Sequence, residues 1–271
     1  MFATDFLFDR QHASDFGLMI CSFDGSPEAA SGGEIEYDVI QTPGRDRFTF
    51  YGIQSNPVIE WHFSICKDPD QNTDLYFTQY EESRIAKWLL QRDGYRLFQF
   101  FQEGYEDIFY YAFINMQPHQ ILGQTAGFDL TVTSDCAYGF TGILRQKATL
   151  SASSGPLEFR LQSDVNTYIL PRITFKCTGN FKIRNENDPN HPETEFKNLE
   201  AGRTWEFIMD ADADTVFLKD GENFVPLPNP SMFNWHFLRL TDGTNRIIVQ
   251  AEPGITIETE IQYREPRRVI L

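Results

Sequence analysis

The stretch SDFGLMICSFDG, residues 14–25, decides how the start of the chain is interpreted. It contains a six-residue apolar run that is followed at once by a turn sequence. A signal peptide needs a basic leader, an apolar core of about 7–15 residues and a small-residue cleavage site. Here Asp5, Asp9 and Asp15 precede the run, and Arg10 is the only basic residue there. The run is therefore expected to be the first β-strand of a fold.

The composition of the 271-residue chain favours an acidic, β-rich protein. Aromatic residues make up 15% of it, including 25 Phe, and such side chains suit strands and interfaces. Acidic residues outnumber basic ones by 39 to 23. Because nucleic-acid binding depends on clustered Lys and Arg, we do not expect a sequence-specific nucleic-acid partner. The acidic charge would, however, allow the protein to form a surface past which DNA moves without binding. No stretch approaches the ~20 apolar residues of a membrane-spanning helix, so no membrane partner is predicted.

Short strands separated by turn residues are predicted along both halves of the chain, from polar–apolar alternation and aromatic or β-branched enrichment. In the first half they are residues 16–22, 33–40, 47–52, 58–66, 95–101, 107–114 and 127–135. In the second half they are residues 172–179, 180–187, 204–210, 215–221, 235–240, 245–251 and 254–265. Turns about every 8–12 residues are typical of a β-sandwich or jelly roll.

One helix is predicted within the first half, in TQYEESRIAKWLLQRDG, residues 78–94. Thr78 and Glu81 have the spacing of a capping box, and Gly94 lies where a C-cap glycine is common. Its apolar residues share one face: Ile85, Trp88 and Leu89. We therefore expect the helix to pack on the sheet.

A Ser-, Gly- and Pro-containing segment, residues 151–166, indicates a domain boundary, which we place near residue 150. The expected fold is mainly β, with two domains. Residues 1–150 form a β-sandwich that carries the helix, and residues 151–271 form a second sandwich of jelly-roll type.

Four widely separated cysteines, Cys21, Cys66, Cys136 and Cys177, lie in or beside apolar runs. None belongs to a CxxC pair. Because a cysteine thiol packs as a small hydrophobe, we expect all four to be buried thiols in a reducing compartment.

Motifs for catalysis and cofactor binding are absent from the sequence, including GxSxG, GxxxxGK[ST], GxGxxG and HExxH. The five histidines show no metal-ligand spacing. His62 and His236 lie in aromatic runs and are expected to be packed or surface strand residues. No cofactor and no catalytic residue is predicted.

Two acidic segments are candidate cation sites. DADAD, Asp210 to Asp214, imitates the start of a calcium loop, but Thr215 and Gly221 stand where an EF-hand needs Gly and Glu. A polar hairpin turn is the expected structure. NENDPNHPETE, residues 185–195, contains two prolines and is expected to be an exposed loop. No metal site is therefore predicted.

Paired carboxylates and tryptophans leave two further functions open. Glu258 and Glu260 share one strand face, as the acid pair of a glycoside hydrolase would require, but a solvated face that protects an exposed strand edge is the preferred interpretation. Trp205 and Trp235 are candidates for a sugar-binding platform, although core packing is expected more often. The second half lacks the sequence pattern of galectins. Because of these two tryptophans, the main alternative function is a carbohydrate-binding module that adheres to host cell-wall sugars.

Several segments together resemble the distal tail protein (Dit) family of long-tailed, non-contractile bacteriophages and their prophage relatives. They are SDFGLMICSFDG, the helix EESRIAKWLL ahead of YRLFQFF, FDLTVTSDCAYGF, SDVNTYILPRITFKCTGNFKIRNEND, NLEAGRTWEFIMDADADTVFLKDG and LTDGTNRIIVQAEPG. Their order and spacing span nearly the whole chain.

The resemblance implies a structural virion protein of the tail tip, made in the bacterial host cytoplasm. In the family, an N-terminal β-sandwich with a belt-like arm assembles into a homohexameric ring, and a C-terminal galectin-like sandwich points outward. The ring joins the tail tube protein to the tail-tip protein, and in many relatives it holds receptor-binding proteins. The family has no catalytic residues to transfer. The loop DGSPEAASGGE, residues 24–34, is predicted to form part of an intersubunit arm.

Overall fold

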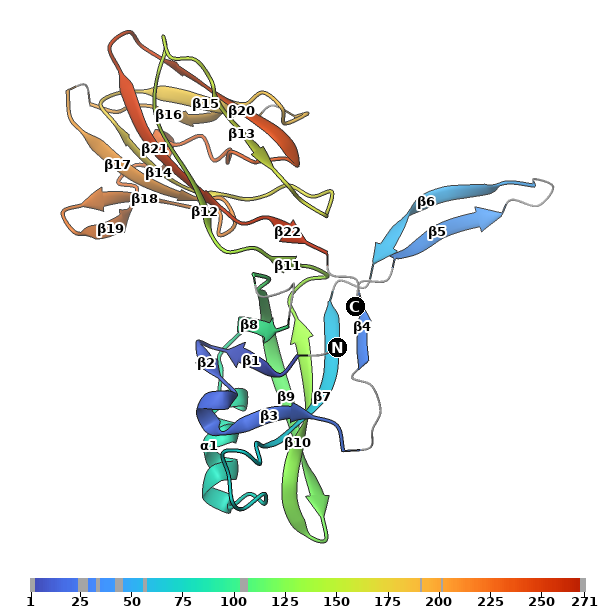
Figure 1. Cartoon of the computed structure of the whole chain (residues 1–271). Helices are drawn as coiled ribbons and strands as arrows, with labels where there is room; N and C mark the ends of the chain where they lie inside the picture. The colour runs from blue at the N-terminus through green and yellow to red at the C-terminus, as the bar shows by residue number, and fades with distance from the viewer. Residues whose placement is uncertain are drawn as a thin grey trace. The chain divides into compact units, whose positions relative to one another are not determined.

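The computed structural model describes residues 3–23, 29–32, 35–41, 46–55, 58–102, 107–190, 192–200 and 202–268 (Figure 1). The chain divides into two compact units. Unit 1 comprises Met1–Phe140 and Arg267–Leu271, and unit 2 comprises Thr141–Pro266. The boundary therefore precedes the predicted junction near residue 150. The reason is that β12 (Leu144–Ser151) pairs along its whole length with β21 (Thr256–Tyr263), so it belongs to a sheet of unit 2.

Unit 1 is built on an antiparallel sheet of eight strands in the order β2-β1-β8-β9-β10-β7-β3, with β4 also pairing with β7. These strands are β1 (Asp5–Phe8), β2 (Gln11–His12), β3 (Leu18–Cys21), β4 (Ala29–Gly32), β7 (Ile59–Lys67), β8 (Arg96–Phe101), β9 (Tyr110–Ile121) and β10 (Gln124–Ser134). A short strand, β11 (Gly139–Phe140), and a 3-10 turn at Ser14–Phe16 complete the unit. The apolar run of the opening stretch thus forms strand β3, as predicted, but it is not the first strand, because β1 and β2 precede it.

The sheet of unit 1 folds over on itself. Phe6 of β1 and Phe63 of β7 lie 5.5 Å apart between ring centroids, although three strands separate β1 from β7 in the sheet order. Trp61 of β7 likewise lies 5.8 Å from Phe98 of β8. Two ends of one continuous sheet therefore face each other across an aromatic core. The predicted sandwich is confirmed, and it is made from a single sheet.

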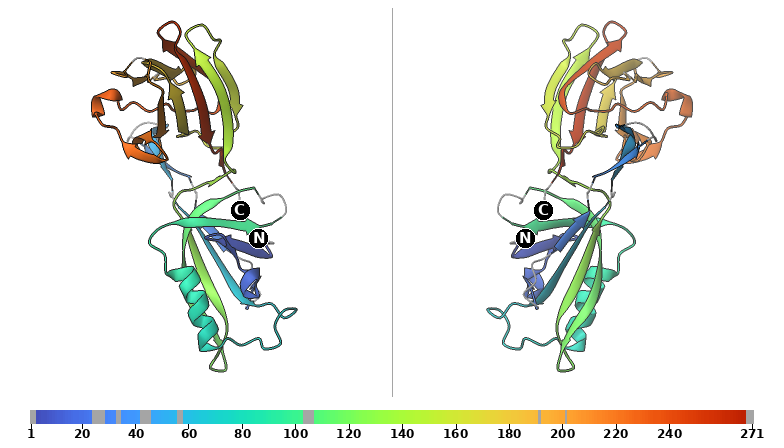
Figure 2. Two further views of the ribbon diagram at one scale, coloured as in Figure 1. Left: turned by 90° about the vertical axis from the view of Figure 1, so that its left-hand side faces the viewer. Right: turned by 90° about the vertical axis from the view of Figure 1, so that its right-hand side faces the viewer.

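The α-helix α1 (Gln79–Leu90) runs beside this sheet and packs against β9 (Figure 2). The predicted capping box is present, since the Thr78 side chain accepts a hydrogen bond from the Glu81 backbone and the Glu81 side chain accepts one from the Thr78 backbone. The predicted apolar face is buried in the core. The helix ends at Leu90 with Gln91 as its C-cap, so Gly94 is not the capping residue.

A separate two-stranded hairpin lies between β4 and β7 in the chain. It consists of β5 (Ile35–Gln41) and β6 (Phe48–Ser55), which pair only with each other among the described strands. We call this hairpin the arm. The predicted arm segment, residues 24–34, is described only at 29–32, and these residues form β4 on the edge of β7. Residues 24–28 and 33–34 lie outside the described part.

Unit 2 is a sandwich of two antiparallel sheets, in the orders β12-β21-β14-β17-β18-β19 and β13-β20-β15-β16. The remaining strands of these sheets are β13 (Leu157–Leu161), β14 (Arg172–Cys177), β15 (Phe181–Asn185), β16 (Thr194–Phe196), β17 (Trp205–Asp210), β18 (Thr215–Asp220), β19 (Asn223–Pro226) and β20 (Gly243–Ala251). A two-residue strand, β22 (Pro266–Arg267), belongs to neither sheet. Phe175 of β14 contacts Phe181 of β15, 5.3 Å apart between ring centroids, so the two sheets share one core.

Residues 235–240 do not form the predicted strand. Trp235 has a φ of 59°, which is incompatible with extended backbone. The Asn234 side chain instead fixes the segment, because its oxygen accepts hydrogen bonds from the backbone of Glu195 and His236. A short 3-10 turn, Pro230–Met232, precedes the segment.

Candidate functional site

The arm exposes apolar side chains on both of its faces. Val39 pairs with Phe50, and Phe48 lies two residues before Phe50 in β6, so these three side chains share one face. Phe48 and Phe50 are 64% and 58% exposed. Ile40, on the opposite face, is 53% exposed. The arm is therefore a candidate interaction surface.

A two-stranded hairpin is at best marginally stable in water by itself. Contiguous exposed apolar side chains of this kind mark surfaces that contact another protein. The arm presents them on a free-standing ladder whose outer edges pair with no other described strand. Its sequence and geometry are therefore suited to insertion between neighbouring proteins.

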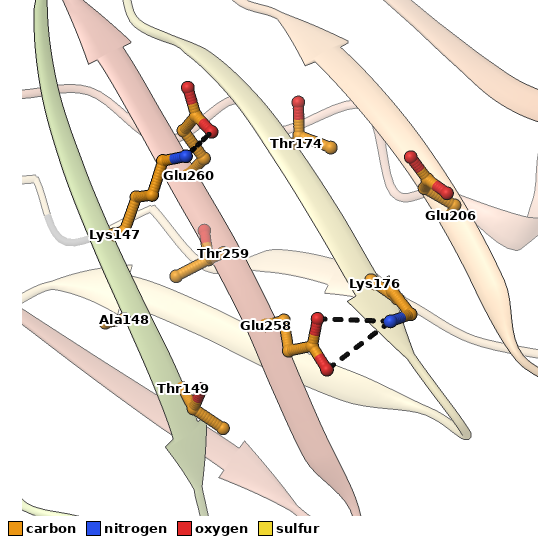
Figure 3. A pocket seen from close by; sticks show the side chains of 9 residues that line it. All are labelled: Lys147, Ala148, Thr149, Thr174, Lys176, Glu206, Glu258, Thr259 and Glu260. Atoms are coloured by element: carbon orange, nitrogen blue, oxygen red, sulfur yellow. Dashed lines mark hydrogen bonds and ion pairs between the residues drawn. The ribbon is translucent and has the colours of Figure 1, made fainter.

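A groove on the outer face of the larger sheet of unit 2 is the second candidate surface (Figure 3). Charged side chains from neighbouring strands line it in pairs. Lys147 lies 2.9 Å from Glu260, and Lys176 lies 3.2 Å from Glu258. Glu206, which also lines the groove, lies 2.9 Å from Lys219. The face is thus polar and largely neutralised by its own ion pairs.

The two carboxylates of this groove do not meet the needs of a glycoside hydrolase. A general acid requires a raised pKa. Hydrogen bonds from Lys147 and Gln262 and the nearby Arg145 charge instead lower the pKa of Glu260 below its usual 4.5. Glu258 is ion-paired with Lys176. The predicted solvated face is confirmed, but β21 lies between β12 and β14 and is not an edge strand, so the predicted protection of an edge is wrong.

The two candidate tryptophans differ in their surroundings. Trp205 is 6% exposed and belongs to the core of unit 2, where its Nε1 donates a hydrogen bond to the Glu200 carbonyl oxygen at 3.3 Å. The Arg203 guanidinium stacks over its ring at 4.1 Å. Trp235 is 49% exposed and donates to the Pro230 carbonyl oxygen. Only Trp235 presents a face to a ligand, and a sugar-binding role for it stays a prediction.

The two acidic segments are structural. Asp210 to Asp214 spans the β17–β18 hairpin turn, as predicted, and Asp214 adopts a φ of 51°. In the segment 185–195, however, Asp188 is fully buried, which corrects the expectation of an exposed loop. It accepts hydrogen bonds from the Nε and an Nη of Arg239. His191 lies outside the described residues. Within the described part of the chain, no group of three or more His, Cys, Asp or Glu residues is placed to hold a metal ion.

A Ser, an Asp and a His lie together on the outer face of unit 1, but in an order that does not suit catalysis. Ser64 donates to Asp129 at 2.6 Å, and His119 Nδ1 lies 3.2 Å from the other oxygen of Asp129. In a catalytic triad the histidine takes the proton from the serine. Here the carboxylate contacts both groups, so the cluster cross-links β7, β10 and β9. His62 is an exposed strand residue 3.2 Å from Thr131, as predicted.

The cysteines differ from their prediction. Only Cys177 is buried, whereas Cys21, Cys66 and Cys136 are partly exposed. Burial raises the pKa of Cys177 to about 11 and that of Cys136 to about 12. These two thiols therefore stay protonated and unreactive at neutral pH.

The fold is thus that of a two-domain β-sandwich protein, and the exposed arm is its candidate surface for contact with other proteins. The chain belongs to a family of phage tail proteins. Residues 1–136 match the model of a phage tail protein N-terminal domain, and residues 138–259 match that of a phage tail C-terminal domain. No curated protein sequence matches the chain. Among the described residues, no helix is long and apolar enough to cross a membrane.

Solved structures share the fold over nearly the whole length. The Dit protein of SPP1, described as a paradigm of the hub adsorption apparatus in phages that infect Gram-positive bacteria, superposes with a TM-score of 0.65 at 11% identity. The match covers 97% of this chain and 98% of that one. A chain of the phage p2 baseplate in its activated conformation with Ca gives 0.51 at 9% identity and covers 100% of both chains. The predicted resemblance to distal tail proteins is confirmed at the level of the fold.

Proposed function

We propose that this chain is the distal tail protein of a long-tailed, non-contractile phage or prophage, and that six copies form a ring at the tail tip. The ring joins the tail tube protein above to the tail-tip protein below. Unit 2 docks further baseplate components, including receptor-binding proteins. The protein acts by assembly and catalyses no reaction. It is made in the host cytoplasm before it enters the virion.

The arm is the observation that carries the proposal. Ring closure requires each copy to offer a surface that a neighbour covers. Val39, Phe48 and Ile40 are such a surface, because they are exposed within one copy and lie on both faces of a hairpin. Full burial of a side chain of this size stabilises by about 1.5–3 kcal/mol. Several such side chains at every junction would hold a ring of identical subunits.

The charge of the chain is compatible with a passage for DNA. In residues 1–150, acidic residues outnumber basic ones by 21 to 10. An acidic wall repels the phosphate backbone, so a genome moves past it without binding. A strongly positive ring lumen would contradict this part of the proposal.

Light scattering and negative-stain imaging of the full chain test the proposal directly. We expect closed rings of six copies at high protein concentration. The double variant Val39→Ser/Phe48→Ser, which removes apolar side chains from one face of the arm, should shift the protein to monomers without changing its circular dichroism. Phe224→Ser, on the exposed strand β19 of unit 2, is the matched control and should leave the rings intact. Rings that persist in the arm variant would contradict the assigned role of the arm.

A further inference from the structure

Cys21 and Cys66 are neighbours on one face of the sheet of unit 1. Cys21 is the last residue of β3 and pairs with Ser64 of β7, while Cys66 pairs with Met19. Since alternate side chains point to opposite faces, Cys21 and Cys66 lie on the same face, diagonally across the two strands. Ile20, which points the other way, is buried in the core. The two cysteine side chains are instead partly exposed.

The two thiols contact each other. A hydrogen bond from Cys21 lowers the pKa of Cys66 below its ordinary value of 9.0, and this effect outweighs burial and the charge of Asp68, which both raise it. A thiolate is the form that attacks disulfides. Cys136 and Cys177 are the opposite case, because burial raises the pKa of both thiols. The pair of thiols on the face of β3 and β7 therefore differs in environment from the other two thiols, Cys136 and Cys177.

Cys21 also lies at the end of an edge strand of the sheet. β3 pairs with β7 as far as Cys21, opposite Ser64, and β4 pairs with β7 from Ala29, opposite His62. Between them, Phe23 stacks on His119 at 4.1 Å between ring centroids, in space left by the missing side chain of Gly127. Cys21 is thus the last residue of β3 that pairs with β7.

We propose that Cys21 and Cys66 are a redox-active pair that forms an intramolecular disulfide and fastens β3 to β7. The Cys66 thiolate attacks one sulfur of a low-molecular-weight disulfide, and a mixed disulfide forms as one thiolate leaves. Cys21 then loses its proton and attacks the Cys66 sulfur, which releases the second thiolate. The protein loses two electrons and two protons, and the small disulfide is reduced to two thiols.

The strand geometry makes this disulfide reversible. A disulfide requires the two Cα atoms to lie within about 6.8 Å. Diagonal neighbours across two strands are usually about 7–8 Å apart. Closure therefore draws the end of β3 inward, and a bond held in this way is more easily reduced than a relaxed one.

The stage of the phage life cycle at which the pair would be oxidised follows from the proposed function. A tail protein assembles in a reducing cytoplasm and is then released with the virion into an oxidising medium. The pair would be reduced while subunits are joined and oxidised once the particle is free. The chemistry of the pair does not depend on this history and can be tested on the isolated chain.

Oxidation of the purified full chain with oxidised glutathione tests the proposal. Intact mass should fall by two hydrogen atoms, and non-reducing peptide mapping should show a Cys21–Cys66 cross-link. Hydrogen exchange of the β3 amides should slow on the order of tenfold or more, because the cross-link opposes local opening. Dithiothreitol should restore the starting mass and exchange.

Single variants separate the two roles. Cys21→Ser should retain a glutathione adduct on Cys66, because the resolving thiol is missing, whereas Cys66→Ser should form no internal cross-link. The double variant Cys136→Ser/Cys177→Ser should still close the Cys21–Cys66 bond. The proposal is overturned if the folded wild-type chain keeps all its thiols, or if its cross-links join other cysteines. Neither result depends on whether rings form, so the proposed function is tested separately.

Discussion

At the residue scale, the buried contact between Asp188 and Arg239 shows what the sequence conceals. Asp188 lies in a loop rich in Asn and Pro, and its partner is 51 positions away, so local composition indicates an exposed carboxylate. In the structure Asp188 is fully buried, and its carboxylate accepts hydrogen bonds from Arg239. Arg239 also stacks on the Tyr168 ring at 3.9 Å. Long-range pairing of this kind leaves no periodic signal in the sequence.

We predict that Asp188→Asn destabilises unit 2. The change leaves Arg239 facing an amide, and breaking a buried ion pair costs about 3–5 kcal/mol. Because the Arg239 side chain is partly exposed, the loss should fall near the lower end of that range. Urea unfolding followed by tryptophan fluorescence measures it. Asp212→Asn, an exposed carboxylate in the β17–β18 turn, is the control. Equal midpoints for the two variants would contradict the prediction.

Trp205 and Trp235 could not be distinguished from sequence alone as buried and exposed residues. Both lie in runs of aromatic residues with similar spacing. Trp205 is the first residue of β17, and its side chain is buried in the core. Trp235 has a positive φ, which is incompatible with a strand at this position. The deciding factor is a backbone conformation held by the Asn234 side chain. Nothing in the residue types alone indicates it.

At the element scale, the helix α1 was the most predictable part of the chain because its signals are local. The capping spacing and the apolar face lie within one segment. The contact that completes its N-terminus is not local. Lys67 of β7 lies 2.8 Å from Glu81 and also donates to the Tyr76 carbonyl oxygen at 2.9 Å.

This contact predicts a dependence of stability on pH. Lys67 and the Thr78 backbone lower the pKa of Glu81 from 4.5 to about 2. The folded state therefore gains stability from the ionised carboxylate above pH 4.5, and it loses this stability as the pH falls toward 2. Glu81→Gln should lower the melting temperature at pH 7 by about 2–4 °C, and the difference from wild type should shrink on acidification.

Thermal melts of the wild type and of Glu81→Gln between pH 7 and pH 2 measure this effect. The series extends to pH 2 because the pKa of Glu81 in the folded state is about 2. Glu82→Gln is the matched control, because it removes a carboxylate from the same helical turn. If both variants follow the same pH dependence, the contact with Lys67 is not the cause.

The strands of the arm were also predictable as elements, but their pairing was not. Residues 33–40 and 47–52 have ordinary strand composition, and nothing in their alternation separates them from the strands of the main sheet. Their exposed aromatic side chains look like core residues in the sequence. A surface that is buried only by a partner and a surface buried within one chain have the same composition.

At the scale of the whole molecule, the two-sandwich architecture follows from the regular alternation of strands and turns. The boundary was placed near residue 150 because residues 151–166 are rich in Ser, Gly and Pro, yet β13 lies within them and β12, just before them, already belongs to unit 2. The folding of the first sheet onto itself depends on aromatic contacts between strands far apart in sequence, such as Phe6 with Phe63. Those contacts are a property of the assembled core.

The central claim is that this chain is a structural part of the phage tail tip. Disruption of its coding sequence in a producing phage or prophage, followed by electron microscopy and infection assays of the released particles, tests it most directly. We predict particles without complete tails and without infectivity, and we predict that supply of the protein in trans restores both. Intact, infectious tails made without the protein would contradict the account.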